Sequence, residues 1–500
     1  MPDTKYDLAI VGAGFSGPIL AAKIAEKGVH PGTGDRLKVA LIEAGPYLAG
    51  APRPGYGVSV RRHRFSNLED SNPAYHWEDG GSAKVVGGSS LHWTAQAFLP
   101  FPMDYIHWQK ETGVDWTGDN FRDAVAEIRR EFNIHQYPDE VDTRGNKLFY
   151  DVAKGLGYDP HRQSGARRNC IYCGFCAGRR MCKYDSRSST LGYVHRAESQ
   201  GVDILADTTV EKILIDSKGK RGVARGLICQ NAGSSYELTA DKIIVCCGYS
   251  KTPLLLMHSG YGPREWRGNR ILVENSNIGK HIDGHPGVPG VSALFDEPLG
   301  DGKVGSIGGY YMIHDDRADG EGRLLFRADF GVNRLPQMAA MNTFAPEFGW
   351  EHKKFMQEKG ILRTGSLRPS VGKGSGRWFI DADGKMLYGG DHSVTIRRAK
   401  EGMAIAREVL EKMGARKITS IDIPVRITEA TRGGHRVGSC RAGVDPRTSV
   451  VNPHFESHDV DNLLICDASV IPRVTTGNSG TPQASVTVFA AGRIVKRHFS

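Results

Sequence analysis

A glycine-marked turn after an apolar strand, close to the N-terminus, constrains the fold of this chain more than any other feature. Residues 7–11 form a short apolar run, which is typical of a buried parallel strand. Gly12 fits the tight turn that follows, Gly14 lets bare backbone approach a pyrophosphate, and Gly17 lets the next helix pack closely against the strand. That helix begins near Ser16, and its N-terminus offers free N–H groups and a positive dipole end to phosphates. The segment is therefore predicted to bind a dinucleotide.

The next apolar run, residues 37–42, closes with an acidic residue, Glu43. A carboxylate at the end of this second strand can accept hydrogen bonds from both hydroxyls of an adenosine ribose, and it disfavours a 2′-phosphate. Three glycines alone are a weak signal, whereas glycines between a strand and a helix, followed by such a carboxylate, are specific. The pattern predicts a ligand that contains ADP, as FAD and NAD do.

Composition narrows the classes of protein that fit. The 500 residues suffice for two large units with buried cores, and 39% hydrophobic and 24% charged residues are ordinary for a soluble enzyme. No apolar stretch has the length of a membrane span, and the N-terminus has no charged-then-apolar leader, so we expect no secretory signal and a cytoplasmic location. The net charge of +9 is scattered and no nucleic-acid-binding motif accompanies it, so we expect no nucleic-acid partner.

Further motifs follow the nucleotide fingerprint in a fixed order. They are Val-Gly-Gly-Ser-Ser-Leu-His-Trp at 86–93, an apolar strand and turn at 245–256, Gly-Lys-His-Ile-Asp-Gly-His-Pro at 279–286, His-Arg-Val-Gly-Ser-Cys-Arg-Ala-Gly at 435–443 and Leu-Ile-Cys-Asp-Ala-Ser-Val-Ile-Pro at 464–472. By these motifs and their order, the chain resembles the glucose–methanol–choline (GMC) flavin oxidoreductases over nearly its whole length.

The resemblance implies an α/β (α+β) fold, in which a Rossmann-like FAD-binding domain holds an inserted substrate domain built on a mainly antiparallel sheet. The FAD-binding domain is expected to be assembled from separated segments. The expected boundaries are 1–100, 201–285 and 430–500 for that domain, 101–200 for a linking segment with a cysteine cluster at 170–182, and 286–429 for the substrate-binding domain.

The resemblance also assigns the cofactor, FAD, and the positions that contact it. These are Gly12, Gly14, Ser16, Gly17, Glu43, Ala44, Gly87, Gly88, Ser89, His92, Val210, Asp467 and Ala468. In some members of the family a histidine in the loop of His92 is bonded covalently to the flavin. A covalent bond and a noncovalent contact both fit the pattern here.

Two residues are expected to act on the substrate hydroxyl. His435 stands at the position of the family's catalytic histidine, and a neutral imidazole can accept a hydroxyl proton near working pH. The second catalytic position of the family is assigned to Asn478, whose amide can hold the same oxygen without competing for the proton. The sequence around Asn478 departs from the family pattern, and a slip of two or three residues would place Gly480 or Thr481 there instead.

Four of the nine cysteines lie in one short run with the spacing C-x2-C-x2-C-x5-C, at Cys170, Cys173, Cys176 and Cys182. Thiolates this dense suit an iron–sulfur cluster or zinc, and neighbouring arginines such as Arg167 would offset the negative charge. The alternative is a surface loop without metal, either reduced or disulfide-bonded. Some bacterial members of the family hold an iron–sulfur cluster beside the flavin, so the resemblance favours the cluster, with zinc as the alternative.

The predicted function is an FAD-dependent dehydrogenase that oxidises a secondary alcohol of a sugar, glycoside or sugar acid. The cysteine run resembles that of bacterial gluconate- or glucoside-oxidising flavoprotein subunits. Such subunits work with a small partner subunit and a cytochrome c, and co-export with the partner would place the chain in the periplasm. The alternatives are an oxygen-using alcohol oxidase, a non-catalytic flavin-binding subunit and a lyase on a flavin scaffold. The sequence leaves the substrate, the hydroxyl and the electron acceptor open.

Overall fold

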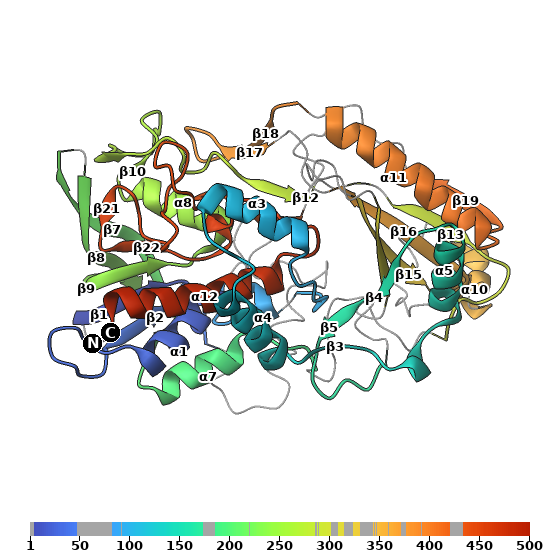
Figure 1. Ribbon diagram of the computed structural model, residues 1–500, viewed down its shortest axis with the longest axis horizontal. Helices are drawn as coiled ribbons and strands as arrows, with labels where there is room; N and C mark the ends of the chain where they lie inside the picture. The colour runs from blue at the N-terminus through green and yellow to red at the C-terminus, as the bar shows by residue number, and fades with distance from the viewer. Residues whose placement is uncertain are drawn as a thin grey trace.

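Two sheets at opposite ends of the molecule organise the chain (Figure 1). The computed structural model describes residues 5–47, 83–91, 93–173, 186–219, 221–285, 288, 290–301, 309–314, 324–330, 344, 346, 348–358, 360–371, 377–391, 393–420 and 434–500. The α/β class and the antiparallel second sheet predicted from the resemblance are both confirmed.

The first sheet has a parallel centre. It runs from β6 (Asp203–Leu205) through β2 (Val39–Ile42) and β1 (Lys5–Val11) to β9 (Ser234–Val245), and β22 (Leu463–Ile465) also pairs with β9 in parallel. All four residues of β2 are buried, as expected for a parallel strand covered on both faces. Beyond β9, β8 (Arg221–Asn231) pairs with β9 and β7 (Thr208–Lys218) pairs with β8, both antiparallel. The short strand β21 (Val460–Asp461) pairs with β8 in parallel.

Helices from distant parts of the chain cover the first sheet. The terminal helix α12 (Gly480–His498) packs on α1 (Gly17–Lys27) and α4 (Asp119–Glu131), and α7 (Leu191–Ser199) packs on α1. α8 (Gly248–His258) contacts β7, and α3 (Pro102–Thr112) lies above α12 in Figure 1. Among the described helices, none has the length and apolarity that crossing a membrane requires.

The second sheet is antiparallel throughout. Its strands follow the order β19 (Lys417–Ser420), β13 (Val291–Leu294), β16 (Thr364–Val371), β15 (Leu324–Phe330), β14 (Tyr310–His314) and β4 (Pro160–Arg162). Its outer face packs on α11 (Ser393–Lys412) and α5 (Arg144–Gly155), and α10 (Gly349–Gln357) lies at the same end of the molecule (Figure 1). Because β4 and α5 come from residues 101–200, the segment predicted to link the domains also builds the second sheet's layers.

Short elements complete the described fold. The pair β12 (Asp283–His285) and β20 (Gly434–Val437) is the one that matters for the site, because it brings two distant motifs together. The others are β10 (Tyr261–Gly262) with β11 (Val273–Glu274), β17 (Arg377–Ile380) with β18 (Met386–Gly389), β3 (Ile134–Gln136) with β5 (Ser164–Ala166), and the 3-10 turns η2 (Gly88–Leu91), η3 (Asp139–Val141), η4 (Gly360–Arg363) and η5 (Ala468–Val470).

Candidate active site

The turn after β1 has the geometry that a pyrophosphate needs. Gly12 has a φ of 100°, and a Cβ there would lie 2.7 Å from the carbonyl oxygen of Cys246. A Cβ at Gly17 would lie 1.9 Å from the carbonyl oxygen of Gly12, so glycine is what lets α1 approach the turn this closely. Gly14 faces open space, with no heavy atom within 4 Å of a built Cβ. Bare backbone is thus exposed at the start of α1.

Glu43 ends β2 as a buried carboxylate. Its Oε2 accepts a hydrogen bond from the N–H of Ala13, and its Oε1 accepts one from the N–H of Gly45, both at 3.0 Å. Burial raises the pKa of Glu43 from its ordinary value of 4.5 to about 7. Each carboxylate oxygen has lone pairs left for a ribose hydroxyl.

A second glycine turn closes over the first. Gly88 has a φ of 47°, and a Cβ there would lie 2.6 Å from the Cα of Gly14. The N–H of Gly87 donates to the carbonyl of Ala13 at 2.8 Å, which fixes the two turns against each other. His92, the candidate for a covalent flavin bond, lies outside the described residues.

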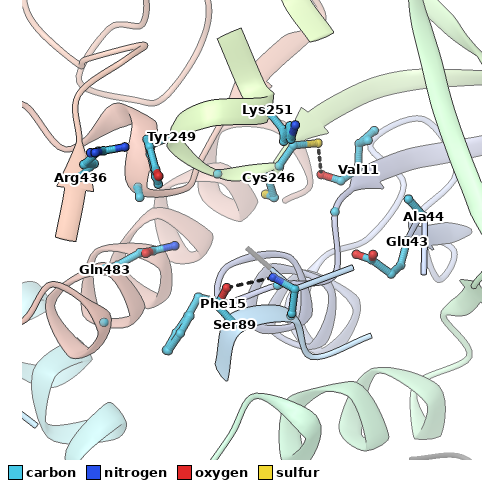
Figure 2. Close-up of a pocket in the computed structure, with 18 of the residues that line it drawn as sticks. Val11, Phe15, Glu43, Ala44, Ser89, Cys246, Tyr249, Lys251, Arg436 and Gln483 are labelled. Atoms are coloured by element: carbon cyan, nitrogen blue, oxygen red, sulfur yellow. Dashed lines mark hydrogen bonds between the residues drawn. The ribbon is translucent and has the colours of Figure 1, made fainter. Parts of the chain in front are cut away.

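A cavity of about 860 Å³ connects these turns with the candidate catalytic residues. Figure 2 shows Glu43 and Ala44 on one side of it and Tyr249, Arg436 and Gln483 on the other. The predicted positions that line the cavity are Gly12, Gly14, Glu43, Ala44, Gly88, Ser89, Val210, Ala468, His435 and Asn478. One continuous space therefore joins a nucleotide end to a catalytic end.

Four predicted positions lie outside the cavity lining and support it from behind. Gly17 and Gly87 set the close approaches described above. The hydroxyl of Ser16 contacts Gln483 Nε2 at 3.1 Å. Asp467 is 2% exposed, and its carboxylate accepts hydrogen bonds from the N–H of Gly248 at 2.7 Å, the hydroxyl of Thr252 at 2.6 Å and the N–H of Ser469 at 2.7 Å. Its side chain thus fixes the turn at η5, whereas the next residue, Ala468, lines the cavity.

His435 sits at the catalytic end in a left-handed conformation, with a φ of 61°. The ladder between β12 and β20 brings His285 beside it, with ring centroids 5.5 Å apart and the rings nearly perpendicular. The N–H of Ser479 points at His435 Nδ1 from 3.4 Å, which is too long to fix the tautomer of the imidazole. Burial lowers the pKa of His285, which favours its neutral form.

Asn478 lies at the same end and offers an unused acceptor. Its side-chain Nδ2 donates to Gln96 Oε1 at 3.2 Å, while its buried Oδ1 has no hydrogen-bond partner among the described residues. A buried polar atom without a partner is costly. Since Asn478 lines the cavity, the orphaned acceptor fits a ligand that donates a hydrogen bond there.

The loop that holds Asn478, residues 474–481, is fixed by two buried carboxylates. Asp283 Oδ2 accepts from the N–H of Val474 at 3.2 Å. Asp104 Oδ1 accepts from both the N–H and the hydroxyl of Thr476, each at 3.0 Å. Asp104 was not among the predicted site residues, although a carboxylate in the first turn of a helix that begins at Pro102 is a local signal of capping.

Other side chains of the cavity also escaped the sequence analysis. Tyr249, Lys251 and Arg436 lie within the motifs at 245–256 and 435–443, but nothing local marked them. Gln96 reaches the cavity from a loop and Arg327 reaches it from β15. Residues that meet only through tertiary packing leave no spacing signal in the sequence.

The cysteine run is described in part. Cys170 is half-buried and Cys173 is exposed, whereas Cys176 and Cys182 lie outside the described residues. Nearby, Arg167 is 0% exposed, and its three guanidinium nitrogens have no hydrogen-bond partner among the described residues. Its backbone bridges to that of Arg187, whose guanidinium donates to the carbonyl of Trp93, a residue of the cavity lining.

A sheet with a parallel centre, a glycine turn, an acidic strand end and a cavity that reaches a histidine are together typical of a dinucleotide-dependent oxidoreductase. Two family profiles described as GMC oxidoreductase match residues 77–287 and 387–490. The chain belongs to this family, as its motifs predicted. Its cofactor is accordingly FAD, and it oxidises alcohol groups.

Relatives and solved structures agree with this assignment. Choline oxidase from Arthrobacter globiformis is 26% identical, with 96% of this chain and 92% of that protein covered. Ecdysone oxidase from Spodoptera littoralis is 22% identical, with 99% and 92% covered. Pyridoxine 4-oxidase from Mesorbium loti has a TM-score of 0.70 at 18% identity, with 99% and 100% covered. Formate oxidase from Aspergillus oryzae has a TM-score of 0.72 at 17% identity, with 100% and 99% covered. The two structures show the fold alone.

Proposed function

We propose that the protein is a dehydrogenase that oxidises a secondary alcohol of a sugar, glycoside or sugar acid. The observation that supports this most is the cavity itself, which runs from Glu43 to His435 and Asn478 and is polar at its catalytic end. The unpartnered Oδ1 of Asn478 suits a substrate with several hydroxyl donors. Arg327 and Arg436 line the cavity as well, and such positive charge disfavours a quaternary ammonium substrate such as choline.

The chemistry divides between the cofactor and two side chains. FAD, when bound, supplies the acceptor for the hydride that leaves the carbinol carbon. His435 accepts the proton of the hydroxyl, and the second N–H of the Asn478 side chain, the one not directed at Gln96, donates to the same oxygen and so does not compete for that proton. The Oδ1 of Asn478 is left to accept from a different hydroxyl of the substrate. Gln96 orients the amide of Asn478, and the loop 474–481 keeps it at the cavity. The contacts of Gly12, Gly14, Glu43, Gly88, Ser89, Val210 and Ala468 with FAD are part of this proposal.

The second candidate is an oxygen-using oxidase, because several relatives are named as oxidases or as oxygen-dependent dehydrogenases. Stoichiometric peroxide formed in air during turnover would favour the oxidase. A small partner subunit, a cytochrome c acceptor and export with that subunit stay predictions. A non-catalytic flavin-binding role and a lyase activity also stay open to the experiment below.

We also propose that the cysteine run binds an iron–sulfur cluster, with zinc as the alternative. A centre of four thiolates is anionic, and the guanidinium of Arg167 fits an anion close by: it is buried, lies 5.3 Å from the ring centroid of Tyr172 and has no hydrogen-bond partner among the described residues. Anaerobic purification followed by iron, zinc and sulfide analysis tests this. Protein that is free of both metals after such handling would overturn it.

Anaerobic bleaching of the flavin against a panel of sugars, glycosides and aldonates tests the main proposal. We expect at least one of them to bleach the flavin, and His435→Ala to slow bleaching by orders of magnitude while FAD stays bound. If choline and simple alcohols bleach the flavin and no carbohydrate does, the substrate class is wrong. Near-normal bleaching by His435→Ala would remove the catalytic role of His435. Acid precipitation separates covalent flavin, held in the pellet through His92, from noncovalent flavin in the supernatant.

A further inference from the structure

We propose that the substrate bears a carboxylate and that Arg327 binds it at the catalytic end of the cavity; this inference rests on the function proposed above. Arg327 belongs to β15, in the middle of the antiparallel sheet. It lines the same cavity as His435 and Asn478. The sheet would thus form the substrate-binding wall, opposite the elements that bind the nucleotide.

The alternation of side chains along β15 explains why an arginine faces the cavity. Leu324, Phe326 and Ala328 are buried in the core that the sheet forms with α5 and α11. Successive side chains of a strand point to opposite faces, so Arg327 lies on the other face, toward the cavity. The polar residue is therefore placed by strand register, on the face away from α5 and α11.

Two contacts locate the guanidinium of Arg327 near the candidate catalytic residues. Its Cζ lies 5.9 Å from the ring centroid of Phe98. Phe98 in turn packs on Gly477, where a Cβ would lie 2.4 Å from the Cβ of Phe98, one residue before Asn478. Burial is the main cause of the lowered pKa of His285, and the positive charge of Arg327 is the second cause. The imidazole of His285 in turn lies beside that of His435.

A guanidinium at this place selects a class of substrate. Its planar set of N–H donors matches a carboxylate with two parallel hydrogen bonds, and the pair is strongest where water is excluded. A hydroxy acid can meet both ends of the site, with its hydroxyl at His435 and Asn478 and its carboxylate at Arg327. The carbinol carbon then loses a hydride to FAD, the oxygen loses its proton to His435, and the product is the corresponding keto acid with its carboxylate unchanged.

An aldonate and its aldonamide, which share every hydroxyl and differ in charge, test the proposal. The ratio of the second-order rate constants for anaerobic flavin reduction should favour the aldonate in the wild type by roughly 10- to 100-fold. Arg327→Gln should bring this ratio close to one, and Arg327→Lys should keep part of it. Arg368→Gln is the matched control, because Arg368 lies opposite Arg327 on the neighbouring strand β16. Arg368 is exposed and does not line the cavity, so this variant should keep the rate-constant ratio of the wild type.

The outcomes separate this inference from the proposed function. If neither compound and no other carbohydrate bleaches the flavin, the proposed function fails. If neutral sugars or the aldonamide react as fast as the aldonate in the wild type, the proposed function stands and the carboxylate site is wrong. That comparison needs no variant, so it decides the question even if Arg327→Gln does not fold. An unchanged ratio in a folded, flavin-loaded Arg327→Gln would assign the selectivity to another residue and overturn the role of Arg327.

Discussion

At the scale of single residues, Glu43 is a carboxylate that the fold itself buries, at the place where we propose that a ribose binds. Its pKa of about 7, against an ordinary 4.5, means that the folded apoprotein holds this proton more tightly than the unfolded chain does. The free energy of unfolding of the apoprotein should therefore fall as the pH rises from about 4.5 to 7, by about 3 kcal/mol, and should be flat above that. Urea unfolding of the apoprotein between pH 4.5 and 8 measures it.

The same proton couples to FAD binding with the opposite sign. Ribose hydroxyls that donate to Glu43 favour its ionised form, so FAD affinity should rise over the pH range in which apoprotein stability falls. Glu43→Gln is the control, because an amide of the same shape has no proton to lose here. In that variant both pH dependences should disappear. If the variant keeps them, another group causes them.

The two glycine turns offer a second test at this scale. A Cβ at Gly88 would meet the backbone of Gly14 at 2.6 Å, so Gly88→Ala should push the turns apart and lower FAD affinity by roughly 10-fold or more. Gly233→Ala is the matched control: its φ of 81° is also left-handed, but nothing lies within 4 Å of its Cβ. It should cost about 1 kcal/mol of stability and leave FAD affinity unchanged. Flavin fluorescence titration and urea unfolding measure the two effects, and equal FAD affinities in the two variants would contradict the prediction.

At the scale of elements, the loop 474–481 is positioned by a carboxylate from α3. Asp104 accepts from three donors, the N–H of Phe101 and the N–H and hydroxyl of Thr476. Asp104→Asn leaves only one side-chain oxygen as an acceptor and turns an amide N–H₂ toward one set of donors. Turnover should fall roughly 10-fold or more, because the loop holds Asn478, while the FAD content stays near that of the wild type.

Asp119→Asn provides the control for that change, because Asp119 is a carboxylate in the first turn of α4 whose side chain is 86% exposed. It should leave turnover per bound flavin unchanged. The prediction fails if Asp104→Asn turns over like the wild type at the same flavin content. A loss of flavin in parallel with turnover would instead show that Asp104 supports the whole fold and not this loop in particular.

Whether a feature could be predicted from the sequence depends on how local its cause is. The first strand, the turn at Gly12 and the carboxylate at Glu43 follow one another within one strand–helix–strand segment, so the sequence pattern was sufficient to predict them. His435 and Asn478 could be assigned only through the family resemblance, since a lone histidine after two glycines has no spacing that marks catalysis. Gln96 and Arg327 were missed because they reach the cavity by packing across long stretches of chain.

At the scale of the whole molecule, the end of the cavity where we propose that FAD binds is assembled from segments across the whole chain. Gly14, Gly88, Val210 and Ala468 line one cavity, although they come from four separate segments. The antiparallel sheet has a separate core with α5 and α11. Neither core is continuous in sequence. Boundaries drawn along the sequence therefore describe segments of the chain better than they describe the two cores.

This division predicts where FAD stabilises the protein. At a free concentration 100-fold above its Kd, FAD should stabilise the folded state by about 2.7 kcal/mol. Because the segments at the nucleotide end of the cavity belong to the first core, FAD should slow amide hydrogen exchange in β1, β9 and α8. It should leave β16 and α11, whose amides lie in the second core, nearly as they are in the apoprotein. Hydrogen exchange read by mass spectrometry, with and without FAD, measures this. Equal protection of both cores would mean that they unfold as one unit, and the prediction would then be wrong.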